Sequence, residues 1–502
     1  MYNIKHMAKA PRIISRLVNQ KDNDILDISV FVILTLLTAV LTLGYFYSTT
    51  IFNDDYSGLK LFGMIIGYQV DKAMNIGLFI PMFIIFIFLL GFFVFLRMQK
   101  TNIFISKTVM ALMVFFVLAR FITNVAFPYG EQTYVIFSSI RQASYSIPFA
   151  GFSASERIIS FLLETLLIVF FGIAFTYIKT FSNKFNKVVN FFLYLLIAVA
   201  IVMNIFSYIT ESAKIVNNLQ VIFTNSDKSF DHGIISFTSH RNVYGFFILM
   251  ASLASMILSF KKKPNPLFLL LVVYFFITCF YLKSRTPFFL IFSTLMVMLV
   301  FNSVFFFKHY KIYSISSMVL FVFIVIFCLL IFCFAPNWEI SIHFRRLFEI
   351  YNDSGTVLAR LDLNTRALDM LSSSFYYVLF GYGKIPFINI YNTFGTMISQ
   401  QTIWSSHNGF LDVLLSYGLV GLASQILCFG VLVYHAISLA FRKPLISFTY
   451  LFVILITIIY GFFEMRVPFG IDPSGLIFVF LLVYPIENEF SAENKKPKPL
   501  LA

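Results

Sequence analysis

The chain of 502 residues is 59% hydrophobic and only 12% charged, and it carries a formal net charge of +14 at pH 7. The charged share is about half of that in soluble domains, which excludes an ordinary water-soluble fold. In a soluble protein the positive charge would suggest nucleic-acid binding. Basic loops beside anionic lipid explain it in a membrane protein, so we expect no nucleic-acid partner.

Apolar runs long enough to cross a bilayer recur along the whole chain. A spanning helix needs ~20 mostly apolar residues, and the sequence therefore predicts an all-α integral membrane protein with about 12 transmembrane helices. The predicted spans lie near 27–49, 74–96, 103–127, 158–178, 188–210, 242–260, 266–282, 287–307, 313–335, 412–440, 446–463 and 468–485.

The spans divide the chain into five consecutive segments. Residues 1–26 form a basic leader, and residues 27–335 hold transmembrane helices 1–9. A large extracytoplasmic loop that contains short helices follows over 336–411. Transmembrane helices 10–12 occupy 412–485, and residues 486–502 form a tail.

Lysine sets the predicted orientation. Every second turn between the spans is basic, as at Lys308 and Lys311, and both terminal segments are basic as well. Because short basic loops stay on the cytoplasmic side, both termini are predicted to lie in the cytoplasm. The segments 128–157, 211–241 and 336–411 are then the long outer loops.

Arginine has the opposite distribution, since most arginines fall in the predicted outer segments or at the outer ends of spans. The guanidinium group cannot be deprotonated in a protein, and its planar fork binds phosphate through two hydrogen bonds. An outward cluster of arginines therefore suggests a site for an anionic, phosphate-bearing substrate.

Cofactor and metal motifs are absent from the sequence. The chain has four cysteines, which all fall inside predicted spans without the spacing of metal ligands, so we expect neither a disulfide nor a metal site. There is also no glycine-rich phosphate loop, and we expect no cofactor. The energy for any reaction must then come with the substrate.

Several short motifs over roughly 235–485 together carry a family resemblance. Their residues are, in chain order, Asn242; Ser284, Arg285 and Thr286; Arg360, Leu361, Ala367 and Leu368; Phe380, Gly381 and Gly383; and His407, Asn408, Gly418 and Gly421. This series resembles the O-antigen ligase and polymerase superfamily. Two positions depart from its pattern, because Asn364 stands where an aromatic is often found and Lys283 where a glycine is common.

The resemblance implies a metal-independent glycosyltransferase of the bacterial inner membrane, with both termini in the cytoplasm. Such an enzyme transfers a glycan from an undecaprenyl-diphosphate carrier to an acceptor on the extracytoplasmic face. The implied partners are the lipid-linked glycan and membrane lipids, and a chain-length regulator and a flippase are candidate protein partners.

The arginines fit this implied chemistry. A diphosphate leaving group gains negative charge as its bond to the sugar breaks, and fixed positive donors stabilise that charge without a metal ion. Arg285 and Arg360 are the catalytic candidates, with Arg241 and Arg366 as substrate-binding helpers. Alternatively, these side chains pair with loop carboxylates or with lipid phosphates.

His407 is the candidate general base, because the ordinary pKa of histidine suits proton transfer near neutral pH. Alternatively, it orients the acceptor or the diphosphate by hydrogen bonding. Asn408 either contacts substrate or, as we favour, caps the helix that follows. Glu464, at the outer end of a span, is a substrate-binding residue and a second candidate base. Asp412 either holds the imidazole or faces water.

Polymerase and ligase share this chemistry and differ only in the acceptor. A polymerase adds the chain to a lipid-linked repeat unit, whereas a ligase adds it to lipid A core, protein or cell wall. No residue decides between them, and we favour a polymerase only because of how common each activity is. A lipid-linked oligosaccharide flippase is the second alternative, although the long outer loop argues against it. A structural subunit is the third.

Overall fold

The computed structural model describes the parts of the chain that form a helical bundle and a few segments around it. The described residues are 117–118, 121–122, 132–138, 143–149, 182–222, 234, 241–260, 264–282, 284–334, 364–365, 367–368, 371–372, 375–381, 408–441 and 443–464. The predicted leader, the tail, and the spans near 27–49, 74–96, 158–178 and 468–485 lie outside them.

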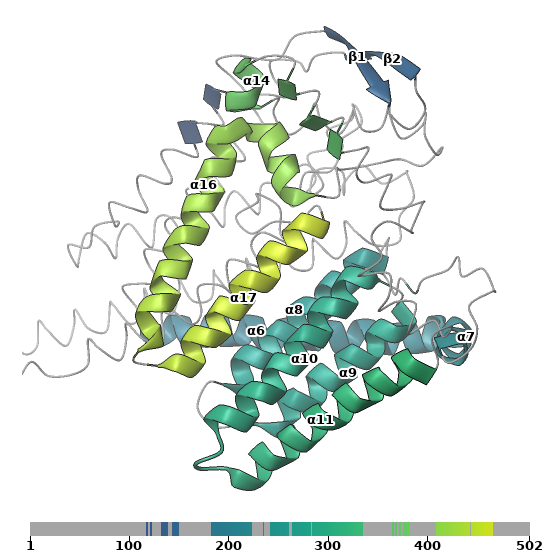
Figure 1. The fold of residues 1–502 in the computed structure, drawn as a ribbon, viewed down its shortest axis with the longest axis vertical. Coiled ribbons are helices and arrows are strands. Elements are labelled where there is room, and N and C mark those ends of the chain that lie inside the picture. Colours follow the sequence, from purple (N-terminus) through teal and green to yellow (C-terminus); the bar gives the residue numbers. More distant parts are fainter. Residues whose placement is uncertain are drawn as a thin grey trace, which may run out of the picture.

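The bundle consists of helices that follow one another from residue 182 to residue 463 (Figure 1). Their bounds are α6 (Ser182–Thr210), α7 (Ser212–Ile222), α8 (Arg241–Ser259), α9 (Pro266–Leu282), α10 (Arg285–Phe305), α11 (Lys311–Phe334), α14 (Phe375–Phe380), α16 (Gly409–Ala440) and α17 (Pro444–Phe463). The helices predicted between 188 and 463 are thus confirmed.

Membrane crossing is supported by the length and composition of these helices. Among the described residues, five helical stretches are long and apolar enough to span a bilayer: Leu193–Thr210, Arg285–Phe305, Lys311–Ile331, Tyr417–Ala440 and Pro444–Phe463. The apolar stretches of α8 and α9 are shorter. The protein is therefore a helical membrane protein, and the full number of spans stays a prediction.

A β-hairpin lies in the segment that was predicted only as an outer loop over 128–157. Strands β1 (Gln132–Ser138) and β2 (Ala143–Phe149) pair antiparallel, with Gln132 opposite Phe149. β1 is rich in β-branched and aromatic residues, which favour the extended conformation. The hairpin adds a small strand element to a fold that was predicted to be all-α.

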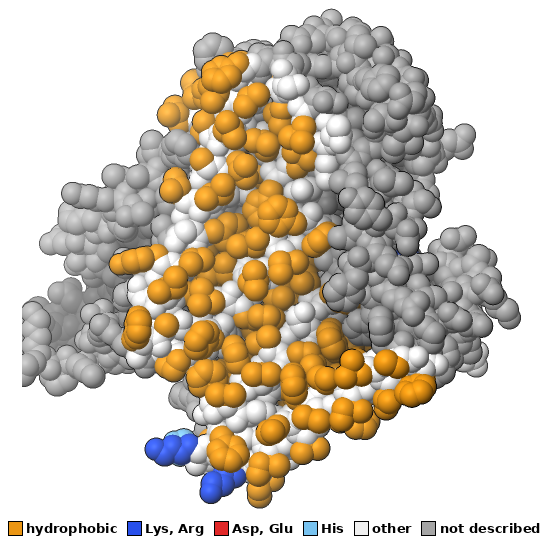
Figure 2. All heavy atoms as spheres, in the orientation of Figure 1, with side chains coloured by type: hydrophobic (Ala, Val, Ile, Leu, Met, Phe, Trp, Pro, Cys, Tyr) orange, Lys and Arg blue, Asp and Glu red, His pale blue; other side chains and the backbone are white. Residues whose placement is uncertain are grey.

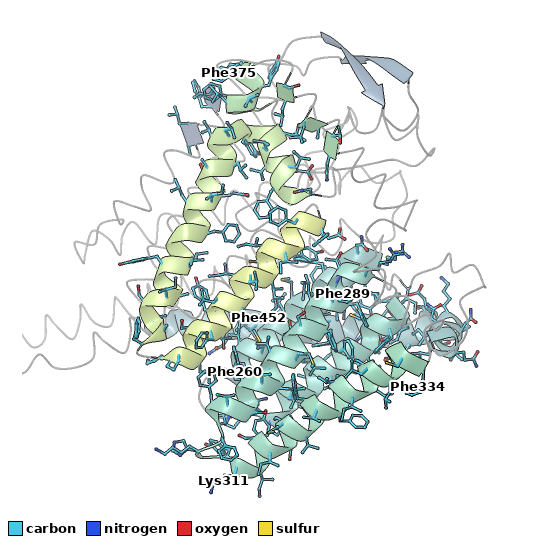
Figure 3. The ribbon with its side chains drawn as sticks, in the orientation of Figure 1. Phe260, Phe289, Lys311, Phe334, Phe375 and Phe452 are labelled. Carbon is cyan, nitrogen blue, oxygen red and sulfur yellow. The ribbon has the colours of Figure 1, made fainter. Side chains whose placement is uncertain are left out.

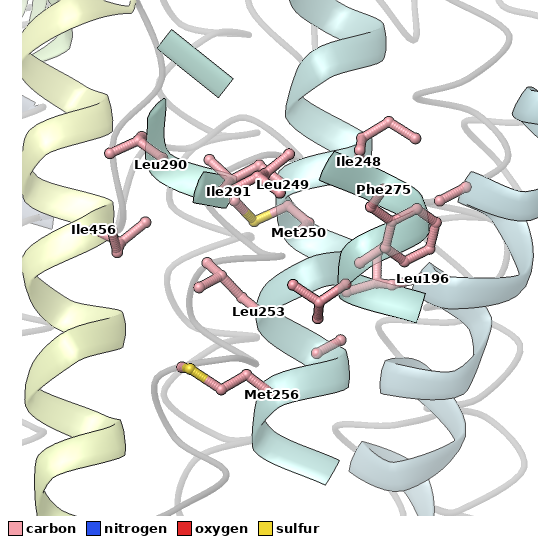
Figure 4. Packing of buried hydrophobic residues seen from close by; sticks show 14 of the residues in the cluster. Leu196, Ile248, Leu249, Met250, Leu253, Met256, Phe275, Leu290, Ile291 and Ile456 are labelled. Atoms are coloured by element: carbon pink, nitrogen blue, oxygen red, sulfur yellow. The ribbon is translucent and has the colours of Figure 1, made fainter. Parts of the chain in front are cut away.

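Helix α8 is the centre of the bundle. Its described side chains from Tyr244 onward are all buried, and it packs against α6, α9, α10 and α17. Figure 4 shows Leu249 and Leu253 of α8 surrounded by Leu196 of α6, Phe275 of α9 and Ile456 of α17. A helix that is buried all round belongs to the interior, and here its neighbours separate it from lipid.

The outer faces of the bundle are apolar as well. Large hydrophobic side chains remain exposed along α11, where Ile312 is 84% and Phe334 83% exposed, and hydrophobic side chains dominate the described part of the face in Figure 2. An apolar patch of this size is unfavourable in water and suits lipid contact. The lysines in this view gather at one end, where Figure 3 labels Lys311.

Candidate functional site

The end of the bundle opposite Lys311 brings together helix ends that are far apart in the sequence. Helices α8 and α10 begin there and α17 ends there. The Asn242 amide Nδ2 donates a hydrogen bond of 3.1 Å to Glu464 Oε1, across 222 positions of sequence. Asn242 Oδ1 accepts a hydrogen bond of 2.9 Å from Ser284 Oγ. We call Ser284, Asn242 and Glu464 the polar triad.

The start of α16 is attached to the same place. The backbone carbonyl of Glu464 accepts a hydrogen bond of 2.9 Å from the Gly409 N–H. Asn408 caps α16, because its Oδ1 accepts a hydrogen bond of 3.1 Å from the Leu411 N–H. The predicted cap is therefore confirmed, whereas contact of Asn408 with substrate stays a prediction. His407, the residue before this cap, lies outside the described residues.

Arg241 and Arg285 occupy equivalent positions as the first residues of α8 and α10, and both are half-buried. The positive end of the helix dipole disfavours a cation there by about 0.3–1 kcal/mol, and acidic residues are the usual occupants. The first turns of these two helices contain no acidic residue. Arg241 and Arg285 thus place two positive charges at helix N-termini, at the same end of the bundle as the carboxylate of Glu464.

Glu464 is the buried acidic member of the site. It forms the C-cap of α17 and is only 4% exposed. Burying a carboxylate is unfavourable unless it accepts hydrogen bonds, and the Asn242 amide supplies one. This contact and its backbone bond to Gly409 place Glu464 between the starts of α8 and α16, and its role toward substrate stays a prediction.

A tight helix crossing holds Asn242 close to Ser284. A Cβ atom built on Gly245 would lie 2.6 Å from Pro287 Cγ and 3.2 Å from Leu282 Cδ2, so no side chain fits at this position. Gly245 and Pro287 each follow a triad residue by three positions. Small residues permit such close approach between membrane helices.

Replacing Gly245 with alanine should therefore separate α8 from α10. The added methyl would clash with the rigid Pro287 ring, and we expect a stability loss of about 1–3 kcal/mol. Thermal unfolding of the purified protein in detergent measures this loss. Gly430→Ala is the matched control, because nothing lies within 4 Å of a Cβ atom there. Equal unfolding temperatures for the two variants would contradict the proposed crossing.

Helix α14 docks onto a kink in α16. Gly418 adopts φ 64°, and a Cβ atom there would lie 2.2 Å from the carbonyl carbon of Leu379. Figure 3 shows Phe375 of α14 beside the bent start of α16. Gly381, with φ 72°, ends α14 in the left-handed conformation that glycine adopts most easily. The signature glycine at 418 thus permits the loop segment to rest on α16.

The large loop is described only in part. Residues 364–365, 367–368 and 371–372 are helical, and Ala367 and Leu371, four positions apart, are both buried. Arg360 and Arg366 lie outside the described residues, so their place in the site stays a prediction. Within the described part of the chain, no group of three or more His, Cys, Asp or Glu is arranged to hold a metal ion.

Several of the predicted site residues therefore meet at one end of the bundle. Arg241, Arg285, Asn408 and Glu464 belong to elements joined there by hydrogen bonds. Sequence reasoning noted Asn242 as part of a motif but missed it as a site residue. Its signal was available, since an asparagine at the end of an apolar span needs a polar partner.

The comparison with protein families agrees with this geometry. Residues 267–426 match the family model described as O-antigen ligase, whereas no curated protein is matched by the chain. The matched segment includes Arg285, Arg360, His407 and Asn408. The superfamily resemblance predicted from the motifs is thus confirmed, and the similarity to the O-antigen ligase family extends over residues 267–426.

Proposed function

We propose that the protein is a polysaccharide polymerase for O-antigen, capsule or exopolysaccharide. It moves a glycan from an undecaprenyl-diphosphate carrier onto a lipid-linked repeat unit on the extracytoplasmic face of the inner membrane, with both termini in the cytoplasm. Enzymes with this domain transfer glycans, which supports the reaction type. The observation behind the proposal is that hydrogen bonds join the segments of Arg241, Arg285 and Glu464 at one end of the bundle.

The positive field at this end suits a diphosphate-linked donor. As the acceptor hydroxyl oxygen attacks the anomeric carbon, the bond from that carbon to the diphosphate oxygen breaks. The diphosphate leaves with both bonding electrons. Arg285 and Arg241, on helix N-termini, stabilise this growing negative charge without a metal ion. Arg360 and Arg366 of the large loop supply further positive charge.

The hydroxyl proton of the acceptor needs a base. His407 takes this role in the proposal, because it directly precedes Asn408, the cap of α16, and Gly409, whose N–H attaches α16 to the Glu464 carbonyl. The Glu464 carboxylate, buried and hydrogen-bonded, orients the acceptor or serves as the second candidate base. Chain-length regulator and flippase proteins are the expected partners, together with the membrane lipids.

A ligase is the second candidate, since the matched family is described as O-antigen ligase and the match does not distinguish the two activities. Its chemistry at the donor would be the same, and only the acceptor would change to lipid A core, protein or cell wall. The two activities are therefore separated by the acceptor that is supplied and not by the residues of the site.

Purified protein should elongate lipid-diphosphate-linked repeat units when these are the only substrate. We expect this reaction without nucleotide sugar and in the presence of a chelator, because the energy lies in the diphosphate linkage and the arginines supply the positive charge. Gel separation of the labelled glycan measures it. Transfer only to an added lipid A core, protein or wall acceptor would establish the ligase. Movement of the units across liposome membranes without elongation would establish the flippase.

A further inference from the structure

We propose that Asn242 is a positioning residue that holds the Glu464 carboxylate in its reactive orientation and couples it to the start of α10, where Arg285 stands. This inference rests on the proposed glycan transfer and extends it. It assigns to Asn242 a role that is exerted through the Glu464 carboxylate. Its basis is the polar triad of Ser284, Asn242 and Glu464.

The hydrogen bonds of the triad have a fixed direction. The Ser284 hydroxyl donates to Asn242 Oδ1, and this fixes which end of the amide faces Glu464. Asn242 Nδ2 therefore donates to Glu464 Oε1. An ionised carboxylate can only accept hydrogen bonds, so the direction of the whole series suits a charged Glu464.

The Ser284 side chain bonds Asn242 and makes no hydrogen bond that caps its own helix. Ser284 occupies the N-cap of α10, where a serine hydroxyl normally accepts a hydrogen bond from the first turn. Ser284 is only 2% exposed and its hydroxyl donates to Asn242 Oδ1, so its side chain connects the start of α10 to α8.

The surroundings of the triad restrict its movement. The contact of Gly245 with Pro287 fixes the crossing of α8 and α10 one turn away. Glu464 is held through its backbone on both sides, because its N–H donates to the Tyr460 carbonyl at 2.9 Å and its carbonyl accepts from Gly409 N–H at 2.9 Å. The backbone of Glu464 is thus held by two hydrogen bonds, and Asn242 Nδ2 binds the carboxylate at the end of its side chain.

The triad also connects the two halves of the proposed chemistry. Ser284 directly precedes Arg285, which stabilises the leaving diphosphate. Glu464 binds the start of α16, directly after the His407 segment. A shift of Asn242 would therefore change the placement of the carboxylate relative to both. Misplacement of a reacting group by ~1 Å costs on the order of 100-fold in rate.

A double-mutant cycle tests this role. The four proteins are wild type, Asn242→Ala, Glu464→Gln and the double variant, each purified and assayed for transfer from the lipid-diphosphate-linked donor to whichever acceptor wild type uses. We expect Asn242→Ala to lower kcat on the order of 10- to 100-fold with little change in KM. In the Glu464→Gln background the same change should have almost no further effect, because Asn242 acts through that carboxylate.

Two further variants separate the positioning of Glu464 by Asn242 from the loss of side-chain volume. Asn242→Asp keeps the shape of the side chain but replaces the donor with a second carboxylate, so kcat should fall at least as far as in Asn242→Ala. Asn204→Ala is the control, since Asn204 is a buried asparagine of α6 whose amide donates to Thr278 Oγ1 of α9 at 3.1 Å, away from the polar triad. It should lower thermal stability but leave kcat per folded molecule unchanged.

The outcomes distinguish this inference from the proposed function. Independent effects of Asn242→Ala and Glu464→Gln on kcat, or full activity of Asn242→Asp, would overturn the positioning role while glycan transfer stands. If wild type transfers no glycan, the proposed function fails. The thermal stabilities of the same four proteins then test the Asn242–Glu464 hydrogen bond. If the stability loss of the double variant equals the sum of the two single losses, the bond is overturned, and a smaller loss supports it.

Discussion

Replacing Arg285 with alanine should abolish long-chain glycan in a strain whose only copy of the gene encodes the variant. Removing one donor to a developing anionic charge typically costs on the order of 100- to 1000-fold in rate. Arg285 begins α10 beside the polar triad, so its charge adds to that of the helix N-terminus. Arg285→Lys should retain part of the activity, because a point ammonium charge lacks the planar fork that binds a diphosphate through paired hydrogen bonds.

The control for this experiment removes a cation at the opposite end of the bundle. Lys308 is exposed just after α10 ends, and Lys308→Ala should give wild-type chain lengths. Glycan chain length is read on gels, and the amount of protein in the membrane is measured for each variant. Wild-type chain lengths from Arg285→Ala at normal protein amounts would remove Arg285 from the mechanism.

Helix positions could be predicted from the sequence because span length is a local property. A run of ~20 apolar residues satisfies its own backbone only as a helix in lipid, whatever its neighbours are. The helices α6, α10 and α17 accordingly lie within a few residues of the predicted spans. The hairpin β1–β2 was not predicted. The segment 128–157 was assigned as an outer loop because it lies between spans, and its content of β-branched and aromatic residues was not considered.

The sequence predicted some of the residues that belong to the site, but it did not predict how they contact one another. Arg285 and Glu464 stand out because charged groups at the ends of apolar spans are rare and usually functional. The contact of Asn242 with Glu464, across 222 positions, depends on how α8 packs against α17, and no local pattern encodes that. Gly245 was missed for the same reason, because its need for glycine arises from Pro287 on another helix.

Gly418→Ala should displace α14 from α16. We therefore expect the variant to lose glycan transfer, because the proposed reaction depends on the large loop. The new Cβ atom would lie 2.2 Å from the carbonyl carbon of Leu379 and 2.3 Å from the backbone N of Phe380, where no side-chain rotation relieves the clash. The positive φ of 64° adds about 1–2 kcal/mol for any residue with a Cβ atom. We expect a total loss of more than about 2 kcal/mol, measured by thermal unfolding in detergent.

Gly430→Ala is the internal control for this prediction, because it adds the same methyl to the same helix with nothing within 4 Å. It should unfold at or slightly above the wild-type temperature, since alanine is favoured over glycine inside a helix by about 1 kcal/mol. Opposite changes at the two glycines would show that position 418 needs glycine for its backbone conformation and its close contact with α14. If Gly418→Ala unfolded like Gly430→Ala and retained glycan transfer, then neither the kink nor the docking of α14 would be needed, and the signature glycine would require a different explanation.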